Sequence, residues 1–289
     1  MTTPPIPTQT LPTLTLPAEP VLVFGGPYSN LQATIALRDE AVRLSIPPER
    51  TICTGDVVAY CADPEETTQA IRDWGCHVIA GNCEEQLADA ADDCACGFDD
   101  GSACAVMAKG WYPYANARVS PESRAWMAAL PKTLRFELAG VSFRVVHGGV
   151  DVINQFLFAS QGDAIKAELA KVAEDVVIAG HCGLPFVAKG ESKVWFNPGV
   201  IGMPANDGSA EVWYGLLEPV DGGVRMTTHR LLYDHNAAAA SMRRGAYADG
   251  YATSLVTGLW PSMDILPPTE AAARGKRRRP KSIVVRGQV

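Results

Sequence analysis

The sequence lacks an apolar run long enough to cross a membrane. Its longest apolar stretches, around Ala179 and across residues 212–217, are well short of the roughly 20 residues that span a bilayer. Residues 1–18 have neither the basic start nor the apolar run of a secretory signal. We therefore expect a cytoplasmic protein without membrane contact, preceded by a disordered leader rich in proline and threonine at residues 1–18.

Standard cysteine spacing is also missing. The chain has 289 residues and eight cysteines but no export signal, so reduced thiols or metal ligands are expected rather than a disulfide scaffold. The segment that contains Cys94, Cys96 and Cys104 matches no standard zinc or ferredoxin pattern. Its role stays open between a metal site, a redox role and simple burial.

Acidic residues are absent from the C-terminal end. Residues 274–289 contain seven basic and no acidic residues, although the net charge of the whole chain is −7. Charge runs at chain ends are usually solvated. We expect one folded domain over residues 19–260 and a flexible basic tail over residues 261–289. Nucleic acid could bind only through this tail.

Short β-rich runs alternate with helical patterns in the first two-thirds of the chain. Helical patterns cover 31–44, 64–74 and 164–172. Such alternation predicts a sheet covered by helices, with polar side chains gathered past the strand ends at one edge. From Lys193 on, β-rich runs dominate, which predicts a second, antiparallel sheet packed on the first. The early runs are Val21–Phe24, Thr51–Thr54, His77–Ala80, Phe143–Val146 and Val176–Ala179.

Four of these runs are followed by a possible metal ligand. Asp56, Asn82, His147 and His181 each stand beside a glycine directly after a strand. Glycine permits positive φ and close approach of the backbone. Oxygen and nitrogen ligands presented in this way are what a divalent metal requires. The sequence therefore predicts a metal site at this edge.

The order and spacing of these motifs resemble calcineurin-like metallophosphoesterases, specifically the small bacterial and archaeal phosphodiesterase-like branch. The resemblance implies a four-layer αββα sandwich of two mixed sheets. It also implies two divalent transition metals, manganese, iron or zinc, which together hydrolyse a small phosphoester. The motifs are Asn30-Leu31-Gln32-Ala33, Gly55-Asp56, Gly81-Asn82, His147-Gly148, Gly180-His181 and Asn197-Pro198-Gly199.

The resemblance also defines what this chain lacks. It assigns Asp56, Asn82, His147 and His181 to the family's second metal, and all four persist. The first metal's ligands are mostly absent. Gly26 and Tyr28 replace an aspartate and a histidine, and Gly183 replaces a second histidine. Tyr28 could donate a hydrogen bond to phosphate or pack as an aromatic side chain beneath the turn.

Cysteines offer replacements for the missing ligands. Cys83 stands at the family's usual position for a general acid, where a thiol is a poor donor, and Glu84 is the nearest substitute. Residues 84–110 form an insert that could fold over the site. A second metal, an iron–sulfur centre or a redox switch could use five cysteines, namely Cys83, Cys94, Cys96, Cys104 and Cys182.

Three functions follow from these residues. The first is hydrolysis of a phosphomonoester or phosphodiester, including nucleotide-type substrates, and the intact second-metal set favours it. The second is a catalytically inactive, metal-binding scaffold such as the retromer scaffold subunit of this superfamily, and the lost first-metal ligands favour it. The third is metal or redox sensing through the cysteines. An oligomer is compatible with all three.

Overall fold

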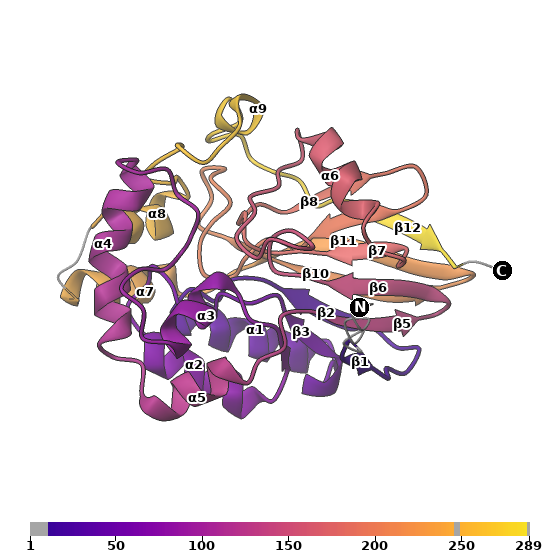
Figure 1. The fold of residues 1–289 in the computed structure, drawn as a ribbon, viewed down its shortest axis with the longest axis horizontal. Helices are drawn as coiled ribbons and strands as arrows, with labels where there is room; N and C mark the ends of the chain where they lie inside the picture. The colour runs from indigo at the N-terminus through magenta and orange to yellow at the C-terminus, as the bar shows by residue number, and fades with distance from the viewer. Residues whose placement is uncertain (1–10, 246–248, 288–289) are drawn as a thin grey trace, which may run out of the picture.

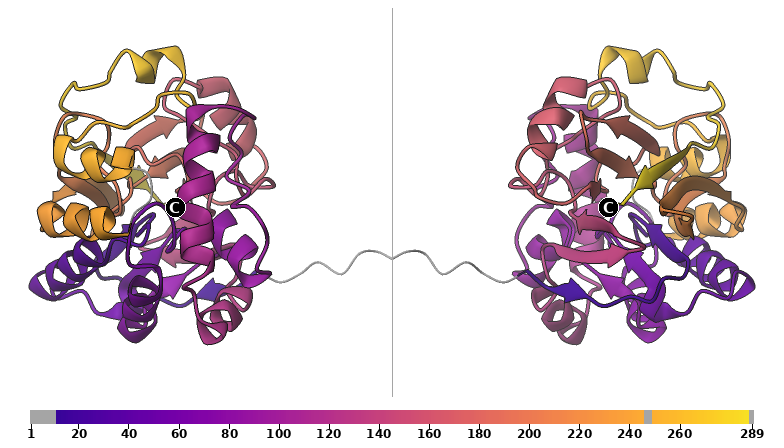
Figure 2. Two further views of the ribbon diagram at one scale, coloured as in Figure 1. Left: turned by 90° about the vertical axis from the view of Figure 1, so that its left-hand side faces the viewer. Right: turned by 90° about the vertical axis from the view of Figure 1, so that its right-hand side faces the viewer.

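The computed structural model describes residues 11–245 and 249–287. Within these residues, two six-stranded mixed sheets pack face to face and helices cover their outer faces (Figure 1). This is the four-layer α/β arrangement expected for a metallophosphoesterase. Figure 2 shows α1 and α2 on one side of the sheets, with α6 and α9 on the other.

The first sheet has the strand order β12-β11-β10-β2-β3-β4. Strands β2, β3 and β4 run parallel, while β10 pairs antiparallel with β2 and with β11. Its strands are β2 (Val21–Phe24), β3 (Thr51–Cys53), β4 (His77–Val78), β10 (Val212–Val220), β11 (Gly223–Leu231) and β12 (Ser282–Arg286).

The second sheet has the order β1-β5-β6-β7-β9-β8. Here β6, β7 and β9 run parallel, so the carboxyl ends of β6 and β7 lie together. Its strands are β1 (Thr13–Leu14), β5 (Leu134–Leu138), β6 (Val141–Val145), β7 (Val176–Ile178), β8 (Phe186–Lys189) and β9 (Val194–Asn197).

The division of strands between the sheets differs from the sequence-based prediction. The runs after Lys193 do not make a separate antiparallel sheet, because β9 pairs parallel with β7 while β10 extends the sheet that contains β2. Strand propensity and burial predict that a strand exists, but they do not determine its long-range partner.

The core lies between the sheets and continues beneath the helices. Val21 and Val23 of β2 face Phe136 and Phe143 of the other sheet, while the alternate residue Phe24 packs under the helices. This alternation follows from the two-residue period of a strand. Two packed sheets buried on both faces give the strand ends a rigid support.

The helices begin and end largely where the sequence indicates. The Asn30 side chain accepts a hydrogen bond from the Ala33 amide and caps α1, and Gly75 ends α2 with a φ of 74°. None of the helices in the described part of the chain has the length and apolar character needed to cross a bilayer. The helices are α1 (Leu31–Arg43), η1 (Pro48–Arg50), α2 (Pro64–Trp74), α3 (Asn82–Ala88), α4 (Ala103–Asn116), α5 (Pro121–Ala128), α6 (Gly162–Leu169), α7 (His235–Arg244), α8 (Asp249–Thr257) and α9 (Pro268–Ala271).

Both chain ends differ from the expected flexible segments. Within the leader, β1 pairs with β5, and residues 1–10 lie outside the described residues. Residues 261–287 contain α9 and β12, and β12 completes the first sheet. The buried Asp207 carboxylate pairs with Arg230 and accepts the Arg278 amide. The basic segment is therefore not the flexible tail that its composition predicts, because acidic partners elsewhere in the chain fix it in place.

Candidate metal centre

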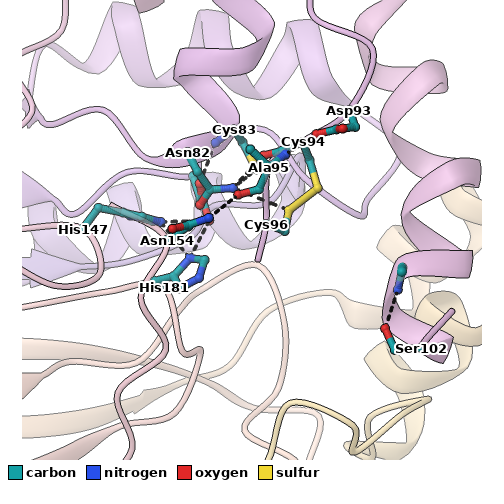
Figure 3. Close-up of a disulfide and its surroundings, with 12 residues drawn as sticks. Asn82, Cys83, Asp93, Cys94, Ala95, Cys96, Ser102, His147, Asn154 and His181 are labelled. Carbon is teal, nitrogen blue, oxygen red and sulfur yellow. Dashed lines mark hydrogen bonds and ion pairs between the residues drawn. A yellow bond between two sulfur atoms is a disulfide. The ribbon is translucent and has the colours of Figure 1, made fainter. Parts of the chain in front are cut away.

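Three candidate ligands meet at the strand ends. His147 Nε2 lies 3.2 Å from Asp56 Oδ2 and 3.1 Å from His181 Nδ1, and His181 Nδ1 lies 4.0 Å from Asp56 Oδ2. All three side chains are buried. Atoms at these separations can share one ion at bonds of about 2.0 to 2.2 Å. Figure 3 shows His147 and His181 facing one another beside Asn82.

The backbone at the ligands is held in an uncommon conformation. Asp56 has a φ of 55° and His181 a φ of 57°, in the left-handed region that residues other than glycine rarely adopt. Between them, a Cβ at Gly81 would lie 2.3 Å from Asp56 Oδ1, so only glycine fits. Such strain concentrates at functional sites.

Neighbouring groups orient the ligands. His147 Nδ1 lies 2.6 Å from the Thr54 carbonyl oxygen. When Nδ1–H donates to that oxygen, the lone pair of Nε2 faces Asp56 and His181, as a metal-binding imidazole requires. The hydrogen bond fixes both the ring orientation and the tautomer.

Glu84 lies beneath the turn that contains Asp56. Its carboxylate accepts hydrogen bonds from the amides of Asp56 at 2.7 Å, Val57 at 2.8 Å and Gly81 at 2.8 Å. Both oxygens are occupied in this way. Glu84 therefore positions the turn. Burial raises its pKa to about 7, and the proton-donor role considered from the sequence stays a prediction.

Proximity and burial set the ionisation of the cluster. Burial opposes ionisation of Asp56, but the adjacent His147 lowers the Asp56 pKa below its usual value. Burial alone would lower the His147 pKa, whereas Asp56 raises it above its usual value. Burial, together with His147, lowers the pKa of His181 to about 3. Neutral His181 keeps a lone pair available for a ligand.

Asn82 provides a fourth donor atom. Its amide nitrogen donates to the Cys94 carbonyl oxygen at 2.9 Å and lies 3.5 Å from Cys96 Sγ, while its Oδ1 is buried without a hydrogen-bond partner. An unpartnered buried acceptor costs about 1–3 kcal/mol. A carboxylate, two imidazoles and an unpartnered amide oxygen form a donor set that fits a divalent transition metal.

Aromatic rings lie beside the glycines that replace first-metal ligands in the resemblance. A Cβ at Gly26 would lie 2.5 to 2.9 Å from ring carbons of Tyr28, so Tyr28 occupies the space where an aspartate side chain would begin. At Gly183, a Cβ would lie 3.3 Å from the ring of Trp260. The Tyr28 ring also meets Tyr60 edge-on at 4.8 Å. Burial raises the Tyr28 pKa well above its usual value, which keeps the phenol neutral.

Two of the eight cysteines differ from the expectation of reduced thiols or metal ligands, and the other six are free. Cys94 and Cys96 form a disulfide beside Asn82 (Figure 3). A tight turn brings their Cα atoms to 5.3 Å, within the usual range for a disulfide. Cys104 and Cys182 instead line a pocket that opens beside His181, and within the described residues the cysteines form no cluster of three free ligands. Nothing in this arrangement supports an iron–sulfur centre.

Sequence reasoning missed several aromatic residues near the ligands. The Phe156 ring lies 4.2 Å from the His181 ring, and Trp260 covers Gly183. Neither belongs to a motif. Phe156 lies nine residues after His147, and Trp260 is far along the chain from every ligand turn. Only the folded structure brings them to the site.

Comparisons with known proteins agree with this architecture. The Calcineurin-like phosphoesterase superfamily domain matches residues 30–220. An uncharacterised protein of Methanocaldococcus jannaschii is 24% identical over 233 residues, which cover 74% of this chain and 88% of that protein.

Two solved structures share the fold. A metallophosphoesterase from Sphaerobacter thermophilus has a TM-score of 0.67 at 20% identity, covering 84% of this chain and 100% of that one. A hypothetical protein from Pyrococcus horikoshii has a TM-score of 0.71 at 17% identity, covering 83% and 99%. With a family match that covers most of its length and a buried cluster able to bind metal, the chain belongs to the calcineurin-like phosphoesterase superfamily, whose members use divalent metals.

Proposed function

We propose that the protein is a phosphoesterase that works with a single divalent transition metal, manganese, iron or zinc. Asp56, Asn82, His147 and His181 would hold it. The observation that carries this proposal is the unpartnered Oδ1 of Asn82, buried beside three clustered ligands. The Tyr28 ring lies where a side chain at Gly26 would begin, and positions 26, 28 and 183 carry no carboxylate or imidazole, so a one-metal site is the arrangement these side chains support.

When bound, the metal supplies Lewis acidity toward a phosphate oxygen and lowers the pKa of a water molecule. The chain supplies the geometry. Thr54 fixes the His147 ring, Glu84 fixes the Asp56 turn, and burial excludes bulk water. The neutral Tyr28 phenol offers a hydrogen-bond donor on the first-metal side, where it can stabilise charge on a phosphate oxygen.

Protonation of the leaving group is the weak point of this site. Burial raises the pKa of the Cys83 thiol well above its usual value, and both oxygens of Glu84 are engaged by backbone amides. The thiol is therefore a weak acid, and Glu84 would have to give up an amide contact to donate a proton. The site should favour esters whose alcohol leaves without full protonation, as phenols do.

The test combines metal analysis with turnover. Protein purified without chelator or affinity metal should contain about one manganese, iron or zinc per chain by plasma mass spectrometry, and it should hydrolyse an aryl phosphodiester. In His147→Ala, we expect loss of the metal and at least a hundredfold loss of turnover, in line with the roughly 10²- to 10³-fold effects of removing single catalytic groups.

A matched variant separates the ligand role from general loss of a histidine. His235→Ala changes a half-buried histidine at the start of α7, so its metal content and turnover should match those of the wild type. Absence of metal and turnover in the wild type, even after addition of manganese, would contradict the enzyme proposal. The scaffold alternative would then remain.

A further inference from the structure

An aromatic pocket opens beside His181. Its volume is about 60 Å³, small for a ligand site, so it offers room for little more than one planar ring. Its wall combines segments far apart in the sequence: the turn after β2, the insert with Phe98, helix α4, helix α8 and the segment around Trp260. Its rings come from Tyr28, Tyr60, Phe98, Phe156, Tyr251 and Trp260.

The wall is pre-formed. Tyr60 packs on Tyr28 at 4.8 Å and on Tyr251 at 4.7 Å between ring centroids. The indole N–H of Trp260 donates to the Pro204 carbonyl oxygen at 2.6 Å, which fixes the orientation of that ring. A ligand entering the pocket therefore has little side-chain ordering left to oppose its binding.

The pocket cannot pair with a charged group of a ligand. Among the described residues that line it, none carries a carboxylate, an ammonium or a guanidinium group. A charged group placed there would lose its hydration without compensation. A planar aromatic group would instead bury apolar surface against rings and the Met107 side chain.

The charge at the ligand cluster limits how much negative charge a bound phosphate group can carry. One divalent ion beside the Asp56 carboxylate, with the Glu84 carboxylate beneath the same turn, leaves at most one positive charge to face the substrate. The pocket adds no lysine or arginine. One positive charge balances a phosphodiester, which carries one negative charge, whereas a phosphomonoester dianion would keep an uncompensated charge in a buried site.

We propose that the substrate is a phosphodiester with one aromatic ester group, whose ring lies in this pocket while its phosphate lies at Asp56, His147 and His181. This inference rests on the proposed function. Hydrolysis forms a bond from the oxygen of water to phosphorus and breaks the bond to one ester oxygen. One proton of water goes to the departing oxygen, so an alcohol and a phosphomonoester leave.

Binding of simple phosphonates tests the pocket separately from turnover. Calorimetry on the manganese-loaded protein would compare methyl phenylphosphonate with methyl methylphosphonate, both monoanions, and with phenylphosphonate, which can carry two negative charges. Burial of the ring should make methyl phenylphosphonate bind at least tenfold more tightly than methyl methylphosphonate. It should also bind more tightly than phenylphosphonate.

Substitutions in the wall provide the matched comparison. Met107→Ala and Phe98→Ala should each weaken binding of the phenyl ligand about three- to tenfold and leave the methyl ligand unchanged. Val106→Ala is the control, because Val106 precedes Met107 on α4, is 59% exposed and does not line the pocket. Val106→Ala should bind both ligands as the wild type does.

The outcomes separate the two proposals. The pocket assignment would be overturned if the wild type, with metal content and turnover intact, bound methyl phenylphosphonate and methyl methylphosphonate equally well. Unchanged binding of methyl phenylphosphonate by Met107→Ala and Phe98→Ala would also overturn it. Tighter binding of phenylphosphonate than of its methyl ester would overturn the diester assignment. A protein that holds no metal and hydrolyses no aryl diester would instead overturn the proposed function.

Discussion

Two groups of turns at the strand ends of the two sheets share one backbone conformation but present different side chains. Tyr28 and Ser29, with φ values of 52° and 57°, adopt the same left-handed conformation as Asp56 and His181. The Tyr28 amide donates to the Asp56 carbonyl oxygen at 3.1 Å, so the turns are directly joined. One group presents ligands and the other presents an aromatic ring. Turns of one backbone conformation can therefore present either a candidate ligand or an aromatic ring.

The altered turn is held by a further contact. The Asn30 side chain donates to the Gly202 carbonyl oxygen at 3.1 Å, and a Cβ at Gly202 would lie 2.4 Å from the Pro27 carbonyl oxygen. This packing links the turn after β2 to the loop after β9. Tyr28 consequently lies in a turn that is closely packed rather than loosened.

The largest expected effect comes from Gly81→Ala, which adds one methyl group between the retained ligands. The added Cβ would lie 2.3 Å from Asp56 Oδ1 and 2.9 Å from His147 Cε1, so both must move. We expect the free energy of unfolding to fall by about 2–3 kcal/mol and metal affinity to fall about a hundredfold. Denaturant titration and metal analysis would measure these changes.

Gly162→Ala is the control for this prediction. Gly162 begins α6, a Cβ added there would have no neighbouring atom within 4 Å, and its backbone is free of positive φ. This change should leave metal content unaltered and stability equal or higher by up to about 1 kcal/mol. If Gly81→Ala behaved like Gly162→Ala, close packing would not be what holds the ligands in place.

The retained ligands were predictable from local sequence because each follows its own strand. A short β-rich run and a glycine identify Asp56, Asn82, His147 and His181 without knowledge of strand partners. The sheet in which β9 pairs was not predictable, because pairing depends on contacts across the whole chain. Trp260 was missed for the same reason: its role depends on Gly183, which is distant in sequence.

Segments assigned from composition were the least reliable. Residues 261–289 are rich in basic side chains, yet β12 pairs with β11 and the Arg277 side chain pairs with Glu211. Composition does not reveal which acidic group will face a basic one after folding. The disulfide between Cys94 and Cys96 was also missed, because a sequence separation of two residues gives no information on the turn that joins them.

An intermediate effect is expected from restoring the missing aspartate. Gly26→Asp places a Cβ against the Tyr28 ring, at 2.5 Å from its nearest carbon, on a backbone with a φ of 37°. It should lower the free energy of unfolding by about 1–3 kcal/mol. In the Tyr28→Ala background the overlap is absent, so the same change should cost about 1 kcal/mol less.

A double-mutant cycle measures this coupling. Denaturant titrations of the two single variants and the double variant give the interaction free energy directly. Additive effects would show that Tyr28 does not occupy the aspartate position, and the comparison between the two turns would then lose its physical basis.

The smallest effect should come from the disulfide beside Asn82. The double change Cys94→Ala and Cys96→Ala removes the Cys96 sulfur, which lies 3.5 Å from the Asn82 amide nitrogen, but keeps the Cys94 carbonyl oxygen that accepts from it. Because Asn82 is oriented less firmly, manganese affinity measured by calorimetry should fall about tenfold. Cys76→Ala, a half-buried cysteine outside this contact, should have no effect.

Reduction of the wild type distinguishes support of Asn82 from direct ligation. If the disulfide only supports Asn82, dithiothreitol should weaken manganese binding in the wild type and have no effect on the double variant. Higher affinity after reduction would show instead that the released thiolates bind the metal, because soft sulfur ligands would then join the oxygen and nitrogen donors. Unchanged affinity in both proteins would separate the cysteine pair from the metal centre and exclude it as a redox control of Asn82.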